Sequence, residues 1–167
     1  AMPSLPAQQY APVQAWFERS AALTPADRAQ ACKLALDLAR AAGDLQAAGY
    51  LETGMGATAL GNKQGLFAYH RSTSNNYTLT VRTSDGTGSG WAAADHRDWA
   101  QLDARRVAER AVEKARLSRN PQAIEPGRYT VILEPQAVGD LVPLLLGAFT
   151  ARTAEEGRSP FSRRGAG

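Results

Sequence analysis

Residues 77–91 read Tyr-Thr-Leu-Thr-Val-Arg-Thr-Ser-Asp-Gly-Thr-Gly-Ser-Gly-Trp, and their pattern decides the fold class. Tyr77, Leu79 and Val81 alternate with polar residues, which is the period of two expected of a strand with one buried face. Asp85-Gly86 is a strong signal for a tight hairpin turn, and the glycine-rich residues 87–92 then form the return strand. The pattern favours an antiparallel meander over a parallel, doubly wound sheet, because strands joined by a tight turn pair antiparallel.

The period of two extends upstream of this hairpin. Residues 49–53 and 57–61 are each predicted to form a strand, and residues 66–71 form the next one. Residues 62–65, Asn-Lys-Gln-Gly, have the composition of a turn in which the glycine takes a positive φ. Asn75-Asn76 is a second turn candidate. The sequence therefore predicts several short strands that lie next to one another in chain order.

Helices are predicted before and after the sheet. Residues 24–27, Thr-Pro-Ala-Asp, combine an N-cap, a proline suited to the first helical position and a capping-box partner. Apolar residues then recur at helical spacing up to Gly43: Ala31, Leu34, Ala35 and Leu38. We expect this helix to cover Tyr77, Leu79 and Val81, through Leu34 and Leu38. A shorter helix over residues 10–20 is also predicted.

Downstream of the sheet, Asp98 is expected to cap a helix with Gln101 at the capping-box position. Its narrow apolar face consists of Leu102, Val107, Ala108, Ala111 and Ala115. Residues 129–133, Tyr-Thr-Val-Ile-Leu, predict a buried strand that joins the sheet or its flank. A final helix follows from about Pro135 to Phe149, kinked or shortened by Pro143.

The order of these elements predicts an α+β fold with an antiparallel β meander packed against helices, followed by helix, strand and helix. We divide the chain into a flexible lead with a short helix (residues 1–22), an α+β domain (residues 23–121) and the start of a next region that we expect to be truncated (residues 122–167). The apolar run of residues 141–149 is too short to span a bilayer, and no signal-peptide pattern is present, so we expect a cytoplasmic protein.

Composition narrows the functional classes. Hydrophobic residues make up 44% and charged residues 21% of the chain, which argues against wholesale disorder. The net charge is +3, but 16 acidic residues are interleaved with the basic ones. Basic residues are concentrated near the carboxy terminus, at Arg152, Arg158, Arg163 and Arg164. Glu155 and Glu156 lie among them and offset part of their charge. A solvated tail is the favoured interpretation, and a nucleic-acid site is the alternative. Cys32 is expected to be a buried, inert thiol.

Local motifs for catalysis are weak. The glycines of residues 86–90 alternate and lead into Trp91, whereas a phosphate-binding loop needs Lys-Ser or Lys-Thr after its glycines. Alternating glycines instead leave a bare face on a strand, against which another backbone or a ring can lie. His70 and His96 are the two histidines of the chain and lie 26 residues apart, so they do not form a zinc-ligand pair. We expect His96 to be a loop or cap residue.

Three blocks of sequence resemble one family. Residues 65–74, GLFAYHRSTS, residues 81–91, VRTSDGTGSGW, and residues 129–140, YTVILEPQAVGD, are similar to TldD/PmbA proteins, which are also labelled modulators of DNA gyrase or peptide-maturation proteins. The resemblance runs from about Thr24 to the end of the chain. It implies an amino-terminal α/β region that leads into a β-rich region with a peptide-binding cleft. In the metal-bearing branch, a helix after the YTVILE-like strand carries HExxxH, with two zinc-binding histidines and a glutamate base.

The resemblance also implies which positions of this chain correspond to that motif. Ala137-Val138-Gly139 matches its centre, so Pro135, Gln136 and Asp140 stand where the motif has histidine, glutamate and histidine. Proline has no ligand atom, glutamine accepts no proton at neutral pH, and one aspartate does not hold zinc by itself. The chain thus resembles the amino-terminal part of a PmbA (TldE) member without the motif. We expect no catalytic residue, no metal and no cofactor in it.

Two functions follow from this resemblance. The first is a non-catalytic scaffold and partner-binding segment of a peptidase system that acts on unfolded or precursor peptides. It would form a homodimer, or a heterodimer with a TldD-like subunit, and Thr87, Gly88, Ser89 and Gly90 would offer strand pairing or peptide contact. The alternative is a binding module that contacts DNA or a DNA enzyme such as gyrase. The interleaved acidic residues count against nucleic acid, and no membrane partner is expected.

Overall fold

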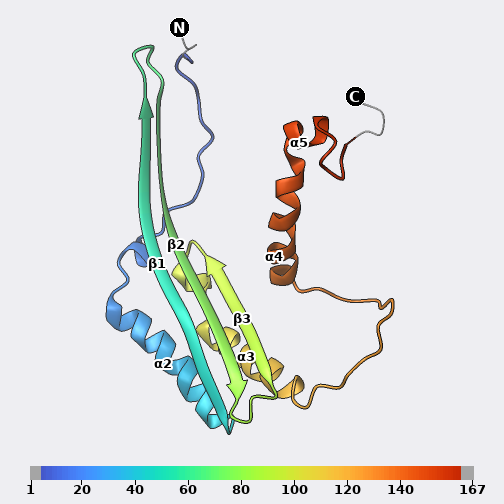
Figure 1. Cartoon of the computed structure of the whole chain (residues 1–167). Helices are drawn as coiled ribbons and strands as arrows, with labels where there is room; N and C mark the ends of the chain where they lie inside the picture. The colour runs from blue at the N-terminus through green and yellow to red at the C-terminus, as the bar shows by residue number, and fades with distance from the viewer. Residues whose placement is uncertain (1–4, 163–167) are drawn as a thin grey trace. The chain divides into compact units, whose positions relative to one another are not determined.

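The computed structural model describes residues 5–162, which fall into two compact units divided between Ala123 and Ile124. The described part of the first unit contains a three-stranded antiparallel sheet in the order β1-β2-β3 (Figure 1). Its strands are β1 (Leu45–Gly61), β2 (Phe67–Thr83) and β3 (Ser89–His96). Helices pack against one face of this sheet. The predicted α+β class and the antiparallel meander are confirmed.

The first two strands are long and continuous, and the prediction of several short strands is wrong. β1 pairs with β2 residue by residue from Leu45 opposite Thr83 to Gly61 opposite Phe67. The predicted turn at Asn75-Asn76 lies inside β2, where the two asparagines stand opposite Thr53 and Glu52. Asparagine tolerates turns, but here the pairing of β2 with its neighbours outweighs that local preference.

Both predicted glycine turns are present. Asn62 Oδ1 accepts hydrogen bonds from the backbone N–H groups of Gln64 and Leu66, and Gly65 takes a φ of +82° to close the β1–β2 hairpin. Gly86 takes a φ of +74° between β2 and β3. Both positions lie in the left-handed region, which a glycine adopts without the steric cost of a Cβ.

Helix α2 (Pro25–Ala41) begins at the predicted capping box. The Thr24 backbone N–H donates to Asp27 Oδ2 at 2.8 Å, and the Asp27 N–H donates to Thr24 Oγ1 at 3.3 Å. The predicted helix over residues 10–20 is reduced to α1 (Glu18–Ala21), because the residues before it are extended and the Ala15 carbonyl bonds to β2 instead.

The helix after the sheet starts later than predicted. Asp98 caps only the short 3₁₀ helix η1 (Trp99–Gln101), by accepting from the Ala100 N–H at 3.0 Å. Asp103 provides a second cap by accepting from the Arg106 N–H at 3.0 Å, and α3 (Ala104–Leu117) begins there. A second acidic N-cap downstream of the first therefore shifted the start of the helix.

The core lies between the sheet and helices α2 and α3. The predicted strand triad Tyr77, Leu79 and Val81 is buried in it. The apolar face predicted for the helix after the sheet is buried as well: Val107, Ala108, Ala111 and Ala115 on α3, and Leu102 just before it. On α2 the prediction is confirmed for Leu38, which packs against this core, and is wrong for Leu34, which is half-buried and does not belong to it. The buried residues of α2 are small, namely Ala31, Ala35 and Ala39, and small side chains let a helix approach closely.

The second unit consists of α4 (Pro135–Leu146), the 3₁₀ helix η2 (Gly147–Phe149) and α5 (Ala151–Glu155) in its described part. Residues 129–133 are not a strand, and Ile132 is 98% exposed. A strand needs a neighbour for its backbone hydrogen bonds, and the described residues supply none here. Pro143 lies inside α4, which ends three residues before the predicted Phe149. Among residues 5–162 no helix is both long and apolar enough to cross a membrane.

Candidate functional site

The positions predicted to correspond to the metal motif lie in the first turns of α4. Pro135 is the first helical residue, and Gln136 Nε2 donates to Asp140 Oδ1 at 2.9 Å. All three side chains are exposed. The single carboxylate is thus engaged by an amide, and neither neighbour contributes an imidazole or thiolate. These residues do not fit a zinc ion, which binds through three or four such ligands. Within residues 5–162 no group of three or more His, Cys, Asp or Glu side chains is placed to hold a metal.

The two histidines lie apart in the sheet. His70 lies in the half of β2 that is nearer to the β1–β2 turn. His96 ends β3 and stands opposite Asn75, which is five positions after His70 in β2. Five residues of strand correspond to about 17 Å. His96 is the last residue of β3, and its Nδ1 accepts from the Asp98 N–H at 2.9 Å. The cap of the following 3₁₀ helix is Asp98 itself, so His96 is neither the loop residue nor the cap residue that the sequence predicted. The two imidazoles do not form a joint site.

The glycine-rich segment packs against the backbone of α3. An ideal Cβ on Gly90 would lie 2.1 Å from the Ala111 carbonyl oxygen, and one on Gly88 would lie 2.3 Å from that of Ala115. The prediction that another backbone lies against this bare face is confirmed. The alternating glycines therefore serve the close approach of a helix to a strand.

Side chains of α3 and its C-cap also occupy the outer edge of β3. The Ser89 N–H donates to Ser118 Oγ, and Ser118 Oγ donates to the Ser89 carbonyl, both at 2.8 Å. Lys114 Nζ donates to the Trp91 carbonyl at 2.8 Å. A partner strand that paired with residues 87–90 would have to displace Ser118. Strand pairing at Thr87, Gly88, Ser89 and Gly90 remains a prediction, and this geometry disfavours it.

A second edge of the sheet has no such cover. β3 pairs only with residues 75–82 of β2, so residues 67–74 have β1 on one side and no strand on the other within the described chain. The Thr73 N–H points to this open side, because it donates to the Ala15 carbonyl at 3.0 Å. We call residues 67–73 the open edge of β2.

The extended residues 5–17, here called the arm, run beside this edge (Figure 1). At one end Ala15 bonds to Thr73 as described, and the Phe17 N–H donates to Thr73 Oγ1 at 3.3 Å. At the other end Asn62 Nδ2 donates to the Leu5 carbonyl at 2.8 Å. Between the two tethers lies a groove of about 700 Å³. Its walls include Tyr10, Val13, Trp16, Leu60, Tyr69 and Arg71.

The charge beside this groove is compensated. The Arg71 guanidinium stacks over the Trp16 ring at 4.5 Å from its centroid, and its Nη2 lies 3.5 Å from Glu18 Oε1. Trp16 Nε1 donates to the same glutamate oxygen at 2.7 Å. The arginine is therefore paired with a carboxylate and an aromatic ring, and the groove does not present the free positive charge that a phosphate ligand needs.

A buried polar cluster fixes the base of the arm, and the sequence analysis missed it. The Arg97 carbonyl accepts from Ser20 Oγ at 3.0 Å, Thr73 Oγ1 at 2.8 Å and Asn75 Nδ2 at 3.2 Å. Thr73 and Asn75 are in phase with the buried triad of β2, and this phase is the signal that could have marked them as inward-facing. Asn75 Oδ1 is buried and has no hydrogen-bond partner among the described residues.

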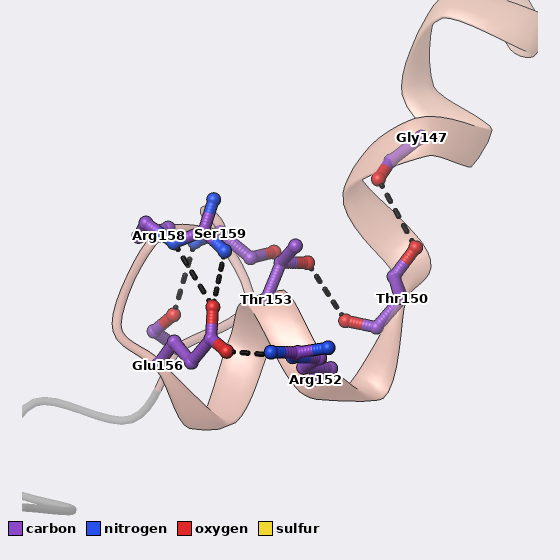
Figure 2. Close-up of polar contacts among 8 residues, drawn as sticks. Gly147, Thr150, Arg152, Thr153, Glu156, Arg158 and Ser159 are labelled. Carbon is purple, nitrogen blue, oxygen red and sulfur yellow. Dashed lines mark hydrogen bonds and ion pairs between the residues drawn. The ribbon is translucent and has the colours of Figure 1, made fainter.

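The basic tail is partly neutralised in the described residues. Figure 2 shows Glu156 between Arg152 and Arg158, with Arg152 Nε 2.8 Å and Arg158 Nε 3.0 Å from its carboxylate oxygens. The hydrogen bonds from Arg152 and Arg158 lower the pKa of the Glu156 carboxyl. Arg163 and Arg164 lie outside the described residues. The pairing favours a local, solvated structure for residues 152–158.

Comparison with known proteins identifies the family. Residues 19–119 match the model of the PmbA/TldA metallopeptidase central domain, and residues 126–166 match that of its C-terminal domain. The chain belongs to the PmbA/TldD family. Its α+β domain corresponds to the central domain of the family, which corrects the expectation of an amino-terminal region.

One solved structure shares the fold of this PmbA/TldD chain. It is the crystal structure of a protein from Thermotoga maritima that is described as a proposed modulator of a DNA gyrase. The match has a TM-score of 0.83 at 18% sequence identity and covers 94% of this chain. The chain spans 37% of the length of that protein. None of the curated proteins matches the chain.

Proposed function

We propose that this chain is a non-catalytic scaffold and partner-binding segment of a PmbA/TldD-type peptidase system that acts on unfolded or precursor peptides. The observation that supports it most is the side-chain set at the motif positions, where the Gln136 amide donates to the Asp140 carboxylate next to Pro135. A zinc peptidase needs histidine ligands and a carboxylate base, and none of them stands at these positions.

The catalytic groups would then come from a TldD-like subunit, with this chain as its partner. Helix α4 supports a role in assembly, because apolar side chains along it are exposed: Val138, Leu141, Val142, Leu144, Leu145 and Leu146. A contiguous apolar surface of this kind needs cover from further protein. In this proposal the cover comes from the remainder of the family's C-terminal domain or from the partner subunit. A homodimer would satisfy the same requirement.

The test has two measurements on protein purified without added zinc. We expect elemental analysis to find no stoichiometric zinc, and we expect the chain alone to leave fluorogenic and unfolded protein substrates intact. Zinc near one equivalent that disappears in Asp140→Ala would contradict the proposal. So would hydrolysis that copurifies with the chain and is lost in His70→Ala or His96→Ala, since these changes leave α4 untouched.

Binding of duplex DNA separates this proposal from the alternative of a DNA-contacting module. Since Arg152 and Arg158 are already paired with Glu156, we expect weak binding that falls steeply as salt rises. Titrations at two salt concentrations with two unrelated DNA sequences measure it. Discrimination between the sequences that persists at the higher salt would favour the alternative.

A further inference from the structure

We propose that the groove between the arm and the open edge of β2 takes up an extended, uncharged peptide segment, which adds to the sheet as a strand beside β2. The choice of an unfolded peptide as the occupant rests on the proposed function. The existence and the direction of the edge are independent of the proposed function, because they follow from the register of the three strands.

The register determines which backbone groups are available. In an antiparallel ladder, alternate residues of a strand direct their N–H and C=O groups to opposite neighbours. Thr73 donates outward to the arm, and the pairing of β1 with β2 continues without interruption from there to Phe67. Phe67, Tyr69 and Arg71 therefore direct their N–H and C=O groups outward. Ala68 and His70 direct theirs to β1. From Phe67 to Thr73 the edge is about 20 Å long.

Residues 6–14 of the arm lie beside this edge and do not pair with it. It is tethered at Ala15 and at Leu5, and within residues 5–162 no backbone hydrogen bond joins residues 6–14 to β2. The groove of about 700 Å³ occupies the interval between the tethers. Unpaired edge groups of a sheet readily accept a further strand. The arm holds this edge open and forms the second wall of the groove.

The walls of the groove indicate the chemistry of its occupant. Val13 and Tyr69 are 63% and 59% exposed and offer apolar contact, whereas the Arg71 charge is compensated by Glu18 and Trp16. Pairing through main-chain groups tolerates many side-chain sequences, which suits an unfolded peptide.

Hydrogen exchange on the full chain tests the proposal without any substitution. The probe is a capped ten-residue peptide in which threonine and valine alternate between two terminal lysines. Its control has the same residues with every threonine and valine N-methylated, which removes the donors needed for pairing. On addition of the probe we expect the amides of Tyr69 and Arg71 to exchange more slowly. The amides of Ala68 and His70 are already paired to β1 and should not change.

A pair of variants gives a second, independent measurement. Tyr69→Pro removes one outward N–H and leaves the ladder to β1 intact, since proline is tolerated at such edge positions. Tyr69→Val removes the same ring and keeps the N–H. We expect Tyr69→Pro to weaken binding of the fluorescein-labelled probe about tenfold relative to Tyr69→Val, as expected for one lost hydrogen bond.

Several results would overturn the proposal. The first is that the N-methylated peptide binds as well as the probe. The second is that the probe slows amide exchange at His70 as much as at Tyr69. The third is that the probe does not bind to the parent chain. A parent dimer that Tyr69→Pro converts to a monomer, with no bound probe, would assign the edge to a second copy of the chain. None of these results touches the side chains at Pro135, Gln136 and Asp140, so strand addition can fail while the proposed function stands. Conversely, zinc-dependent hydrolysis would refute the proposed function and leave the edge unaffected.

Discussion

Replacing Gly90 by alanine places a methyl group inside the backbone of α3. The added Cβ would lie 2.1 Å from the Ala111 carbonyl oxygen, 2.5 Å from the Ala115 nitrogen and 2.7 Å from Lys114 Cβ. Ordinary van der Waals contact begins at 3.4 Å. Two of these three atoms belong to the helix backbone, so no change of side-chain rotamer relieves the overlap. Either α3 or β3 has to move.

Such a movement separates surfaces that form much of the core. Ala108, Ala111 and Ala115 of α3 are completely buried against the sheet. Overpacking a well-packed core costs about 1–3 kcal/mol when side chains can adjust, and more when they cannot. We therefore expect Gly90→Ala to lower the free energy of unfolding by about 3 kcal/mol or more. This is a large part of the stability of a small domain.

Urea denaturation followed by circular dichroism measures the effect, and Gly56→Ala is the matched control. Gly56 also lies within a strand, but a Cβ there would meet nothing within 4 Å. We expect the control to change the free energy of unfolding by no more than about 0.5 kcal/mol. A second-site change of Ala111→Gly should not rescue Gly90→Ala, because the clash is with the Ala111 carbonyl oxygen and not with its side chain. If Gly90→Ala unfolds at the same urea concentration as Gly56→Ala, α3 does not pack on β3 as described.

Leu79→Asp puts an unpaired carboxylate into the core and should cost several kcal/mol, so a melting temperature within a degree or two of the parent would mean that Leu79 is exposed. Asp85, in the β2–β3 turn, has its pKa lowered to about 2 by hydrogen bonds from the Thr83 hydroxyl and from Thr87. Because this pKa lies below the 3.8 of an unperturbed aspartate, the contribution of Asp85 to stability is present above pH 4 and is lost as the pH falls towards 2. In Asp85→Asn the free energy of unfolding should depend less on pH over this interval, and an unchanged acid titration would contradict the assignment. Thr24→Ala removes the capping box of α2 and should cost about 1 kcal/mol in urea denaturation, whereas Thr24→Ser should cost much less.

Several features could be predicted from sequence because short segments determine them. The capping box at Thr24 and the positive φ of Gly65 and Gly86 depend on residues that are neighbours in the chain. The inward direction of Tyr77, Leu79 and Val81 follows from the period of two in a strand. The prediction that Pro135, Gln136 and Asp140 replace the residues of the metal motif also came from the sequence, since it depends on residue types alone.

Other features depended on contacts between distant residues. Asn75-Asn76 has the composition of a turn, yet β1 and β3 pair with it on both sides and keep it in a strand. Residues 129–133 have the composition of a buried strand, yet the described residues give them no partner, and they remain exposed. A backbone hydrogen bond in a sheet joins residues far apart in sequence, so composition alone cannot show whether the partner is present.

The candidate site belongs to this second kind. The sequence alone determined that the chain forms an antiparallel meander, and it predicted Pro135, Gln136 and Asp140 at the positions of the metal motif. Only the tertiary structure showed that residues 67–74 of β2 have no strand on their second side. Ser118 covers the edge at Ser89, whereas the arm is held away from β2 between Ala15 and Leu5. These are contacts between segments 29 to 58 residues apart in sequence, and they arise only when the chain has folded.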